Sequence, residues 1–204
     1  MLVTLSAAAA VLASACGQGG SPAGATGIGT PSSAGTPSSL PLSRGYLEIG
    51  TYRTDVFRPA FTIDIPVSST WGTYGETGRR VMIGDQEGFF GFLALTAASG
   101  QAPTATAFVH TLRAQPGLDV DAVAHPPFAG LPAVRVEVLT ADGPSRIEYG
   151  GQRLGLPRRG HAQLWFVEVG AAPVMIVLAS PATKFRSFSR DALQALDTVQ
   201  FQAG

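Results

Sequence analysis

Residues 161–179 decide the fold and read His161-Ala-Gln-Leu-Trp-Phe-Val-Glu-Val-Gly-Ala-Ala-Pro-Val-Met-Ile-Val-Leu-Ala179. Two segments rich in β-branched and aromatic residues, 161–169 and 173–179, flank a Gly-Ala-Ala linker that suits a tight β-hairpin. The second segment is continuously apolar from Val174 to Leu178, which indicates a strand covered on both faces. We therefore expect Val174–Leu178 at the centre of a β-sheet.

Segments with alternating apolar and polar residues predict further strands around this hairpin. In Leu131–Thr140, valines alternate with Arg135 and Glu137. Phe61–Ile65 alternates in the same way and ends at Pro66, which cannot donate a ladder hydrogen bond. Other strands are expected over Tyr46–Tyr52, Arg80–Gly84, Phe89–Thr96, Val120–Val123 and Val199–Phe201.

Two segments change to helical spacing. Between Thr104 and Gln115 apolar residues recur at i, i+3, i+4 and i+7, with Thr104 as the expected N-cap. A second helix is expected from Ser189 through Leu196. Because hairpin-length connections join the strands, the order of elements predicts an α+β fold, with a mostly antiparallel sheet and helices packed on it.

The motif Phe61-Thr-Ile-Asp-Ile-Pro66, followed by Trp71, resembles the opening of a PsbP/Mog1-like domain. Later positions agree with this resemblance: two long apolar strands, then Phe185, then a terminal helix that leads into Leu196-Asp-Thr-Val-Gln-Phe201. Actinobacterial surface lipoproteins of the LpqN type are similar in layout. The resemblance implies a layered sandwich of the PsbP/Mog1 type and a group of largely non-enzymatic accessory or binding modules.

The N-terminal segment contains the single cysteine of the chain, Cys16. Residues 1–15 match the apolar stretch and small-residue cleavage site of a signal peptide, and Ser14-Ala15 before Cys16 resemble a bacterial lipobox. This resemblance implies that Cys16 is lipidated and anchors the protein on the outer face of the cell membrane. The alternative is an ordinary secretory signal, which leaves Cys16 as a free thiol on a secreted protein.

The segment after Cys16 is built almost wholly from Gly, Ser, Pro, Ala and Thr. Such a composition buries too little apolar surface to offset the entropy of ordering, so residues 16–44 are predicted to be a disordered tether. Aromatic and β-branched residues begin at Gly45, and residues 45–204 are predicted to form one α+β domain.

Composition excludes some functions. Fourteen basic residues balance 14 acidic ones, so the chain lacks the basic footprint that nucleic acid requires. A single cysteine excludes an internal disulfide. No cofactor motif is present, because Gly150-Gly151 and Gly155 lack the spacing and the Gly-Lys-Ser/Thr ending of a phosphate-binding loop.

No catalytic motif is visible in the sequence. The three histidines, His110, His125 and His161, are not at metal-ligand spacing, and there is no Gly-x-Ser-x-Gly elbow. A hydrolase would require His125 or His161 to lie in a cleft beside a carboxylate and a hydroxyl group. Such an envelope hydrolase with a non-motif active site remains an alternative function.

Four arginines, Arg146, Arg153, Arg158 and Arg159, crowd a segment between two long strands that is expected to be a loop over Asp142–Gly160. The arginine fork binds carboxylates and phosphates, so this cluster is a candidate contact for an anionic ligand, lipid headgroup or cell-wall component. The alternative is a solvated, flexible hairpin loop.

Taken together, these features predict a membrane-anchored extracytoplasmic lipoprotein that acts as a non-enzymatic binding or accessory module of the cell envelope. Its expected partners are the membrane, through the lipid anchor, and an anionic envelope component or a protein. A subunit of an envelope complex or transporter is the remaining alternative, and it predicts an exposed apolar patch.

Overall fold

The structure is a computed structural model that describes residues 36–66, 71–94, 103–170 and 173–202. Internal contacts divide the chain into Met1–Ala34 and Gly35–Gly204, and every described residue belongs to the second unit. Residues 36–44, expected to end the tether, are part of this unit. Leu40 is 1% exposed and its N–H donates to the Arg53 carbonyl at 2.8 Å. The folded unit therefore begins before residue 45.

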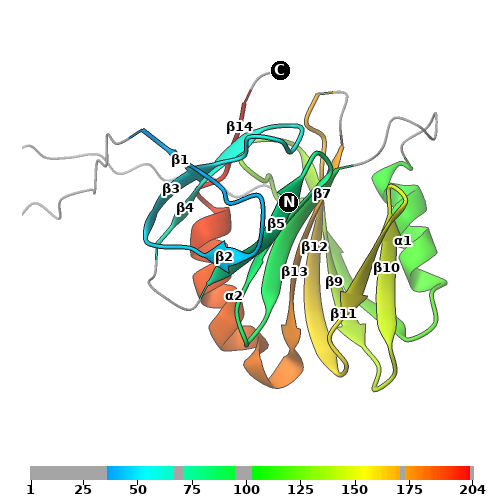
Figure 1. Ribbon diagram of the computed structural model, residues 1–204. Coiled ribbons are helices and arrows are strands. Elements are labelled where there is room, and N and C mark those ends of the chain that lie inside the picture. The colour runs from blue at the N-terminus through cyan, green and yellow to red at the C-terminus, as the bar shows by residue number, and fades with distance from the viewer. Residues whose placement is uncertain (1–35, 67–70, 95–102, 171–172, 203–204) are drawn as a thin grey trace, which may run out of the picture. The chain divides into compact units, whose positions relative to one another are not determined.

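The described strands form a large antiparallel sheet, a smaller sheet and a separate hairpin (Figure 1). The large sheet has the order β2-β5-β6-β7-β13-β12-β9-β8. Its strands in chain order are β2 (Gly45–Tyr46), β5 (Gly72–Thr77), β6 (Arg80–Gly84), β7 (Phe89–Ala94), β8 (Leu118–Ala124), β9 (Ala133–Thr140), β12 (Gly160–Val167) and β13 (Val174–Pro181). The smaller sheet has the order β1-β3-β4-β14, from β1 (Ser38–Ser39), β3 (Gly50–Arg53), β4 (Phe61–Ile65) and β14 (Gln200–Phe201).

Strand β13 lies inside the large sheet and is covered on both faces, as its continuous apolar sequence predicted. Alternate side chains enter two different hydrophobic clusters: Val174, Ile176 and Leu178 face one, whereas Met175 and Val177 face the other. All five side chains are fully buried. The predicted hairpin is confirmed by the antiparallel pairing of β12 with β13, although the turn residues 171–172 lie outside the described part.

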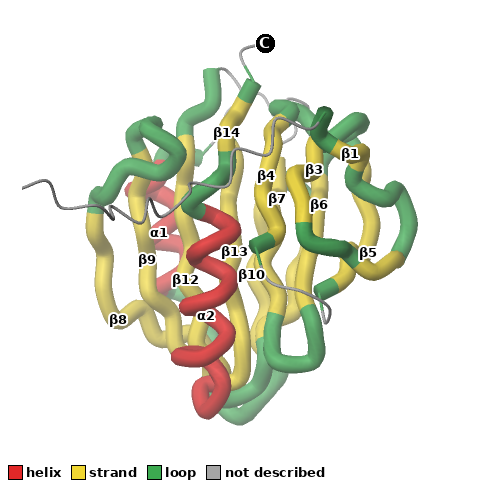
Figure 2. The backbone as a smooth tube through the Cα atoms, turned by 90° about the vertical axis from the view of Figure 1, so that its left-hand side faces the viewer, coloured by secondary structure: helices red, strands yellow, loops and turns green. Residues whose placement is uncertain are grey.

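One face of the large sheet is covered by helix α2 (Ala182–Leu196) together with the smaller sheet. Figure 2 shows α2 lying along β12 and β13, with β9 and β8 to one side of it. The prediction that this helix begins at Ser189 was wrong. The inward spacing of Phe185, Phe188 and Ala192 continues the helical pattern back to Ala182, and Pro181 occupies the N-cap position.

The opposite face is covered by helix α1 (Ala105–Arg113) and by the hairpin of β10 (Ser145–Tyr149) and β11 (Gln152–Leu156). The Thr104 hydroxyl accepts a hydrogen bond from Ala107 N–H at 3.2 Å, which confirms the predicted N-cap. The expected loop over Asp142–Gly160 is corrected, since most of it is this hairpin. Gly150 and Gly151 both have positive φ, at 57° and 74°, as the two central residues of a type I′ hairpin turn require.

Two other differences concern the first strands. The predicted strand over Tyr46–Tyr52 is two strands, because Leu47 turns into the core and β2 and β3 join different sheets. Strand β5 was not predicted: its two glycines weaken the strand pattern, and pairing with β6 and β2 on either side holds it in place. The remaining elements confirm an α+β fold with a large antiparallel sheet and helices packed on it.

Candidate functional site

A cavity of about 470 Å³ opens at one end of the large sheet, beside the first residues of α1. Ala133 and Val134 of β9, Phe166 and Val167 of β12, and Ala105 of α1 form apolar walls. Loop prolines complete them: Pro103, Pro132 and Pro173. The volume lies within the range of small-molecule pockets, and the predominantly apolar lining is typical of them. We call this space the α1 cavity.

Tyr149, the last residue of β10, lies at the back of the α1 cavity. Its side chain is 3% exposed, and its ring packs edge-on against Phe108 at 5.5 Å and Phe166 at 5.6 Å. No described residue hydrogen-bonds to its hydroxyl group. Burial raises the pKa of Tyr149 to about 12, so the phenol is a neutral hydrogen-bond donor at physiological pH. Because Tyr149 lines the cavity, its hydroxyl group is available to a ligand or water there.

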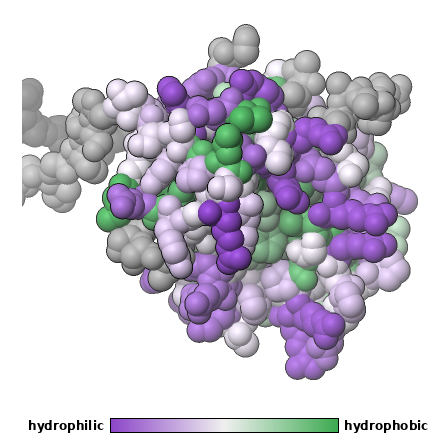
Figure 3. Space-filling model, in the orientation of Figure 1, coloured by the Kyte–Doolittle hydropathy of each residue, from purple (hydrophilic) through white to green (hydrophobic). Residues whose placement is uncertain are grey.

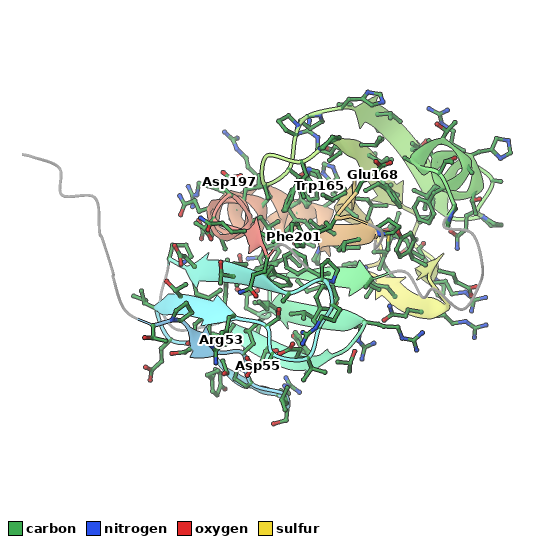
Figure 4. The ribbon with its side chains drawn as sticks, turned by 90° about the horizontal axis from the view of Figure 1, so that it is seen from above. Arg53, Asp55, Trp165, Glu168, Asp197 and Phe201 are labelled. Atoms are coloured by element: carbon green, nitrogen blue, oxygen red, sulfur yellow. The ribbon has the colours of Figure 1, made fainter. Side chains whose placement is uncertain are left out.

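Three more polar residues line the α1 cavity: Thr104, His125 and Glu168. All three are exposed, so they lie toward the mouth and Tyr149 lies deeper. Figure 4, which views the domain from above, shows Glu168 at the end of β12. The first turn of α1 contains no acidic residue, and its free N–H groups add a partial positive charge near Thr104. The cavity thus combines an apolar interior with a small number of polar groups.

The three histidines are placed in different surroundings. His110 is exposed on α1, and His125 lines the α1 cavity from the segment after β8. The His161 Nε2 atom lies 2.8 Å from Oε2 of Glu137, and its ring stacks on Phe185 with centroids 3.7 Å apart. No described hydroxyl group hydrogen-bonds to His161. This pair ties β12 to β9, without the nucleophile that a hydrolase would need.

Glu137 is the centre of a polar row on the sheet face beside α2. Its Oε1 atom accepts a hydrogen bond from Gln163 Nε2 at 2.8 Å and lies 3.6 Å from Arg135 Nε. The buried Arg135 Nε and Gln163 Oε1 atoms have no hydrogen-bond partner in the described structure. The row stabilises the β9–β12 pairing at a position that sequence alternation marked only as outward-facing.

The four predicted arginines form two groups, because β10 and β11 separate them. Arg146 and Arg153 flank Glu148 on the outer face of the hairpin, at 3.7 Å and 2.9 Å from its Oε1 atom. Arg159, in the turn before β12, pairs with Asp142. Arg158 is exposed beside it and makes no ion pair with a described residue. The structure thus keeps the arginines in two groups, and one carboxylate partly neutralises each group.

The remaining predictions of a site lie elsewhere. Cys16, the predicted lipidation site, is outside the described residues. Among the described residues, no group of side chains is suited to hold a metal ion. The described helices α1 and α2 do not combine the length and apolar character needed to cross a membrane.

Comparisons with known proteins assign no family to the chain. No family model matches the chain, and no curated protein matches it. Among similar solved structures, the cyanobacterial PsbP (CyanoP) of Synechocystis sp. PCC 6803 is 8% identical, with a TM-score of 0.46 over 86% of this chain and 99% of that one. LpqN of Mycobacterium tuberculosis, described as involved in cell envelope biogenesis, is 12% identical, with a TM-score of 0.43 over 77% of this chain and 93% of that one.

A third similar structure, from Bacteroides thetaiotaomicron VPI-5482, is 12% identical with a TM-score of 0.37. The match covers 70% of this chain and spans only 45% of that one. All three structures are similar to this chain at low identity, with TM-scores below 0.5. The motif residues that carried the sequence resemblance, Phe61, Ile63, Ile65 and Trp71, are buried together in one hydrophobic cluster.

Sequence reasoning missed the α1 cavity. Tyr149 and Glu168 were not singled out, and Thr104 was recognised only as an N-cap. One signal was available: on either side of Gly150-Gly151, large apolar residues alternate with polar residues or glycine, at Ile147, Tyr149, Leu154 and Leu156. That pattern is typical of a hairpin with one buried face, and it places Tyr149 in the core. No local pattern indicates that β9, β12 and α1 meet around it.

Proposed function

We propose that the domain is a non-enzymatic binding module for a small, largely apolar ligand with a hydrogen-bond acceptor. The observation that carries this proposal is the unpartnered phenol of Tyr149 in the α1 cavity. An acceptor such as a carbonyl or ether oxygen would satisfy the phenol, while the aromatic and aliphatic walls take up the apolar part.

The test uses the neutral dye Nile red, an apolar ring system that carries a carbonyl oxygen. We expect saturable binding by the full chain, monitored by fluorescence. Ala105→Trp places an indole against the cavity and should weaken binding about tenfold or more. Ala107→Trp, on the exposed side of the same helix, is the matched control.

Tyr149→Phe removes only the hydroxyl group and should weaken binding about threefold to tenfold, the range of one hydrogen bond. Equal affinities for the wild type, Ala105→Trp and Tyr149→Phe would show that the dye binds elsewhere and would remove the proposal.

We also propose that lipid on Cys16 holds this module on the outer face of the membrane. The support is the small-residue sequence Ala13-Ser14-Ala15 before Cys16, together with the Gly/Ser/Pro-rich stretch that follows. Intact-mass measurement on the membrane fraction of the native host decides the point. The expected result is a diacylglyceryl or triacyl mass increase that is absent from Cys16→Ala. An unmodified thiol in the culture supernatant would instead indicate a secreted protein.

The arginine groups support a second contact, with anionic envelope material. Four arginines near two carboxylates leave an excess of positive charge on the β10–β11 hairpin and the turn after it. Substitution of Arg153, Arg158 and Arg159 by alanine should weaken co-sedimentation with anionic vesicles, and more so at low salt. The charge-matched control replaces Arg113, Arg186 and Arg190. Unchanged co-sedimentation of the first variant would remove this contact.

An envelope hydrolase is the second candidate, because His125, Glu168 and the hydroxyl group of Thr104 line the same cavity. Hydrolysis of nitrophenyl esters by the wild type, and its loss in His125→Gln, would replace the binding module by an enzyme. We expect no hydrolysis above the level of His125→Gln, because the Thr104 hydroxyl is engaged as the α1 N-cap.

A further inference from the structure

A second hollow, of about 440 Å³, lies across strands β2, β5 and β6, and its lining shares no residue with that of the α1 cavity. Tyr46 of β2 pairs with Gly72 of β5, and Gly72 pairs with Gly84 of β6. Because paired residues point to the same face of a sheet, this row places one large ring beside two positions without side chains. The two glycines form the floor of the hollow.

Neither glycine can be replaced without moving backbone. A Cβ atom at Gly72 would lie 2.9 Å from the Gly45 carbonyl oxygen, and one at Gly84 would lie 2.5 Å from the Gly88 carbonyl oxygen. Backbone therefore approaches both positions too closely for a side chain, and only glycine fits at this part of the lining.

Two tyrosine rings border this floor. Tyr46 is 86% exposed and Tyr74 is 47% exposed. Tyr74 lies at the β-bulge between Thr73 and Gly75, where the ladder register shifts and the strand twists more strongly. As the diagonal neighbour of Tyr46 across the strand pair, Tyr74 has its Cα atom roughly 7–8 Å away, within reach of a second aromatic ring.

Polar groups surround the rings. The Arg44 guanidinium lies 5.3 Å from the centroid of the Tyr74 ring, which holds that ring in place. Gln86 is exposed in the turn after β6 and also lines the hollow. The Asp85 carboxylate accepts hydrogen bonds from the backbone N–H groups of Glu87 and Gly88, at 2.6 Å and 3.1 Å, and so orders the turn that presents Gln86.

The hydropathy of this surface argues against an apolar partner. Figure 3 shows mainly pale and purple residues over β2 and β5, not a continuous green patch. Exposed aromatic rings next to amide, guanidinium and hydroxyl groups instead match a ligand with one apolar and one polar face. A pyranose sugar is such a ligand: its axial C–H groups contact the negative face of an aromatic ring, while its equatorial hydroxyl groups bond to side chains.

We propose that the hollow bordered by Tyr46 and Tyr74 binds the pyranose rings of an oligosaccharide. One sugar stacks on the exposed ring of Tyr46, in the hollow that Gly72 and Gly84 also line. Gln86 and Arg44 hydrogen-bond to its hydroxyl groups. The site is independent of the α1 cavity, so the domain carries a second ligand class on a separate part of the sheet.

The experiment measures binding of three oligosaccharide probes to the full chain by calorimetry. The probes are chitotetraose, maltotetraose and tetragalacturonic acid. All three contain pyranose rings, and they differ in carrying N-acetyl groups, only hydroxyl groups or carboxylates. We expect saturable binding of at least one probe. Tyr46→Ala and Tyr74→Ala should each weaken it about fivefold or more, while Tyr46→Phe should retain it because the stacking face is kept.

Leu139→Ala, at an exposed position on β9, is the matched control and should bind like the wild type. Far-UV circular dichroism confirms that Tyr46→Ala is folded, which its exposure leads us to expect. Failure of all three probes to bind would overturn the proposal, and so would binding that is unchanged in both Tyr46→Ala and Tyr74→Ala. Neither result affects the α1 cavity, which is tested separately with Nile red.

Discussion

Tyr149 allows the α1 cavity to be tested without a ligand, because burial makes the stability of the domain depend on the ionisation of this one phenol. Its pKa is raised by burial from 10.0 to about 12. In the unfolded chain the phenol ionises near 10, so above that pH the unfolded state loses a proton that the folded state keeps. Stability from this group is therefore complete below pH 10 and is lost as the pH rises toward 12.

The size of the effect follows from the shift. Each pKa unit corresponds to about 1.4 kcal/mol, so about two units correspond to roughly 2–3 kcal/mol at the end of the window. Tyr149→Phe lacks the titrating group and retains the ring contacts with Phe108 and Phe166. The difference in unfolding free energy between the wild type and Tyr149→Phe isolates this phenol from every other group that titrates in the same range.

The assay is urea unfolding of both proteins at a series of pH values from neutral to about 12. We expect a constant difference below pH 10 and a loss of wild-type stability, relative to Tyr149→Phe, of roughly 2–3 kcal/mol above it. Near neutral pH the variant should be about as stable as the wild type, since the hydroxyl group that it removes makes no hydrogen bond to a described residue. A difference that stays constant through pH 12 would refute the buried phenol and the site built on it.

Three further predictions concern the scaffold, each read from denaturant unfolding of matched variants. Ile176→Ala in the fully buried β13 should destabilise the domain by about 2–5 kcal/mol, whereas Val123→Ala on the partly exposed edge strand β8 should change stability by less than about 1 kcal/mol. Similar losses of stability in the two variants would contradict the central position of β13. Glu76→Ala should cost about 2–4 kcal/mol, because one Glu76 oxygen accepts two backbone N–H bonds of 2.6 Å from the segment after β3, and a loss below about 1 kcal/mol would contradict those bonds. Thr104→Ala should lower the free energy of unfolding by about 1 kcal/mol through loss of the α1 N-cap. Thr106→Ala, at an exposed position two residues further along, should change stability little, and equal effects of the two variants would argue against the cap.

Much of the fold was predictable because it depends on patterns local in sequence. The alternation in Phe61–Ile65 and Leu131–Thr140 predicted β4 and β9, and the apolar run Val174–Leu178 predicted a covered central strand. Thr104 was correctly predicted as an N-cap, because capping depends only on the residues of one turn. These elements needed no knowledge of their neighbours.

Other elements were mispredicted where neighbours decide the outcome. Strand β5 contains Gly72 and Gly75 and has a weak intrinsic preference for a strand, but strands on both sides pair with it. The N-terminal half of α2 is mostly polar apart from Phe185 and Phe188, and the packing of these two rings on the large sheet extends the helix. In both cases tertiary contacts outweigh local propensity.

The candidate sites show the same division more strongly. The arginines and histidines were visible in the sequence as residue types, but their pairing with Glu148, Asp142 and Glu137 was not. The residues that now matter most, Tyr149 in the α1 cavity and Tyr46 beside its glycine floor, carry no motif. A tyrosine acquires a binding role only through what lies around its ring and hydroxyl group.

By itself the sequence determined the elements that repeat an apolar period, the balanced charge that argues against nucleic acid, and the candidate anchor at Cys16. Tertiary structure alone decided where cavities open, because a cavity forms between segments far apart in the chain. Residues from α1, β9, β10 and β12 meet around Tyr149, and residues from three strands meet at Gly72. Periodicity specifies which face of a strand is buried, whereas the packing of one element against another specifies which buried group is left without a partner.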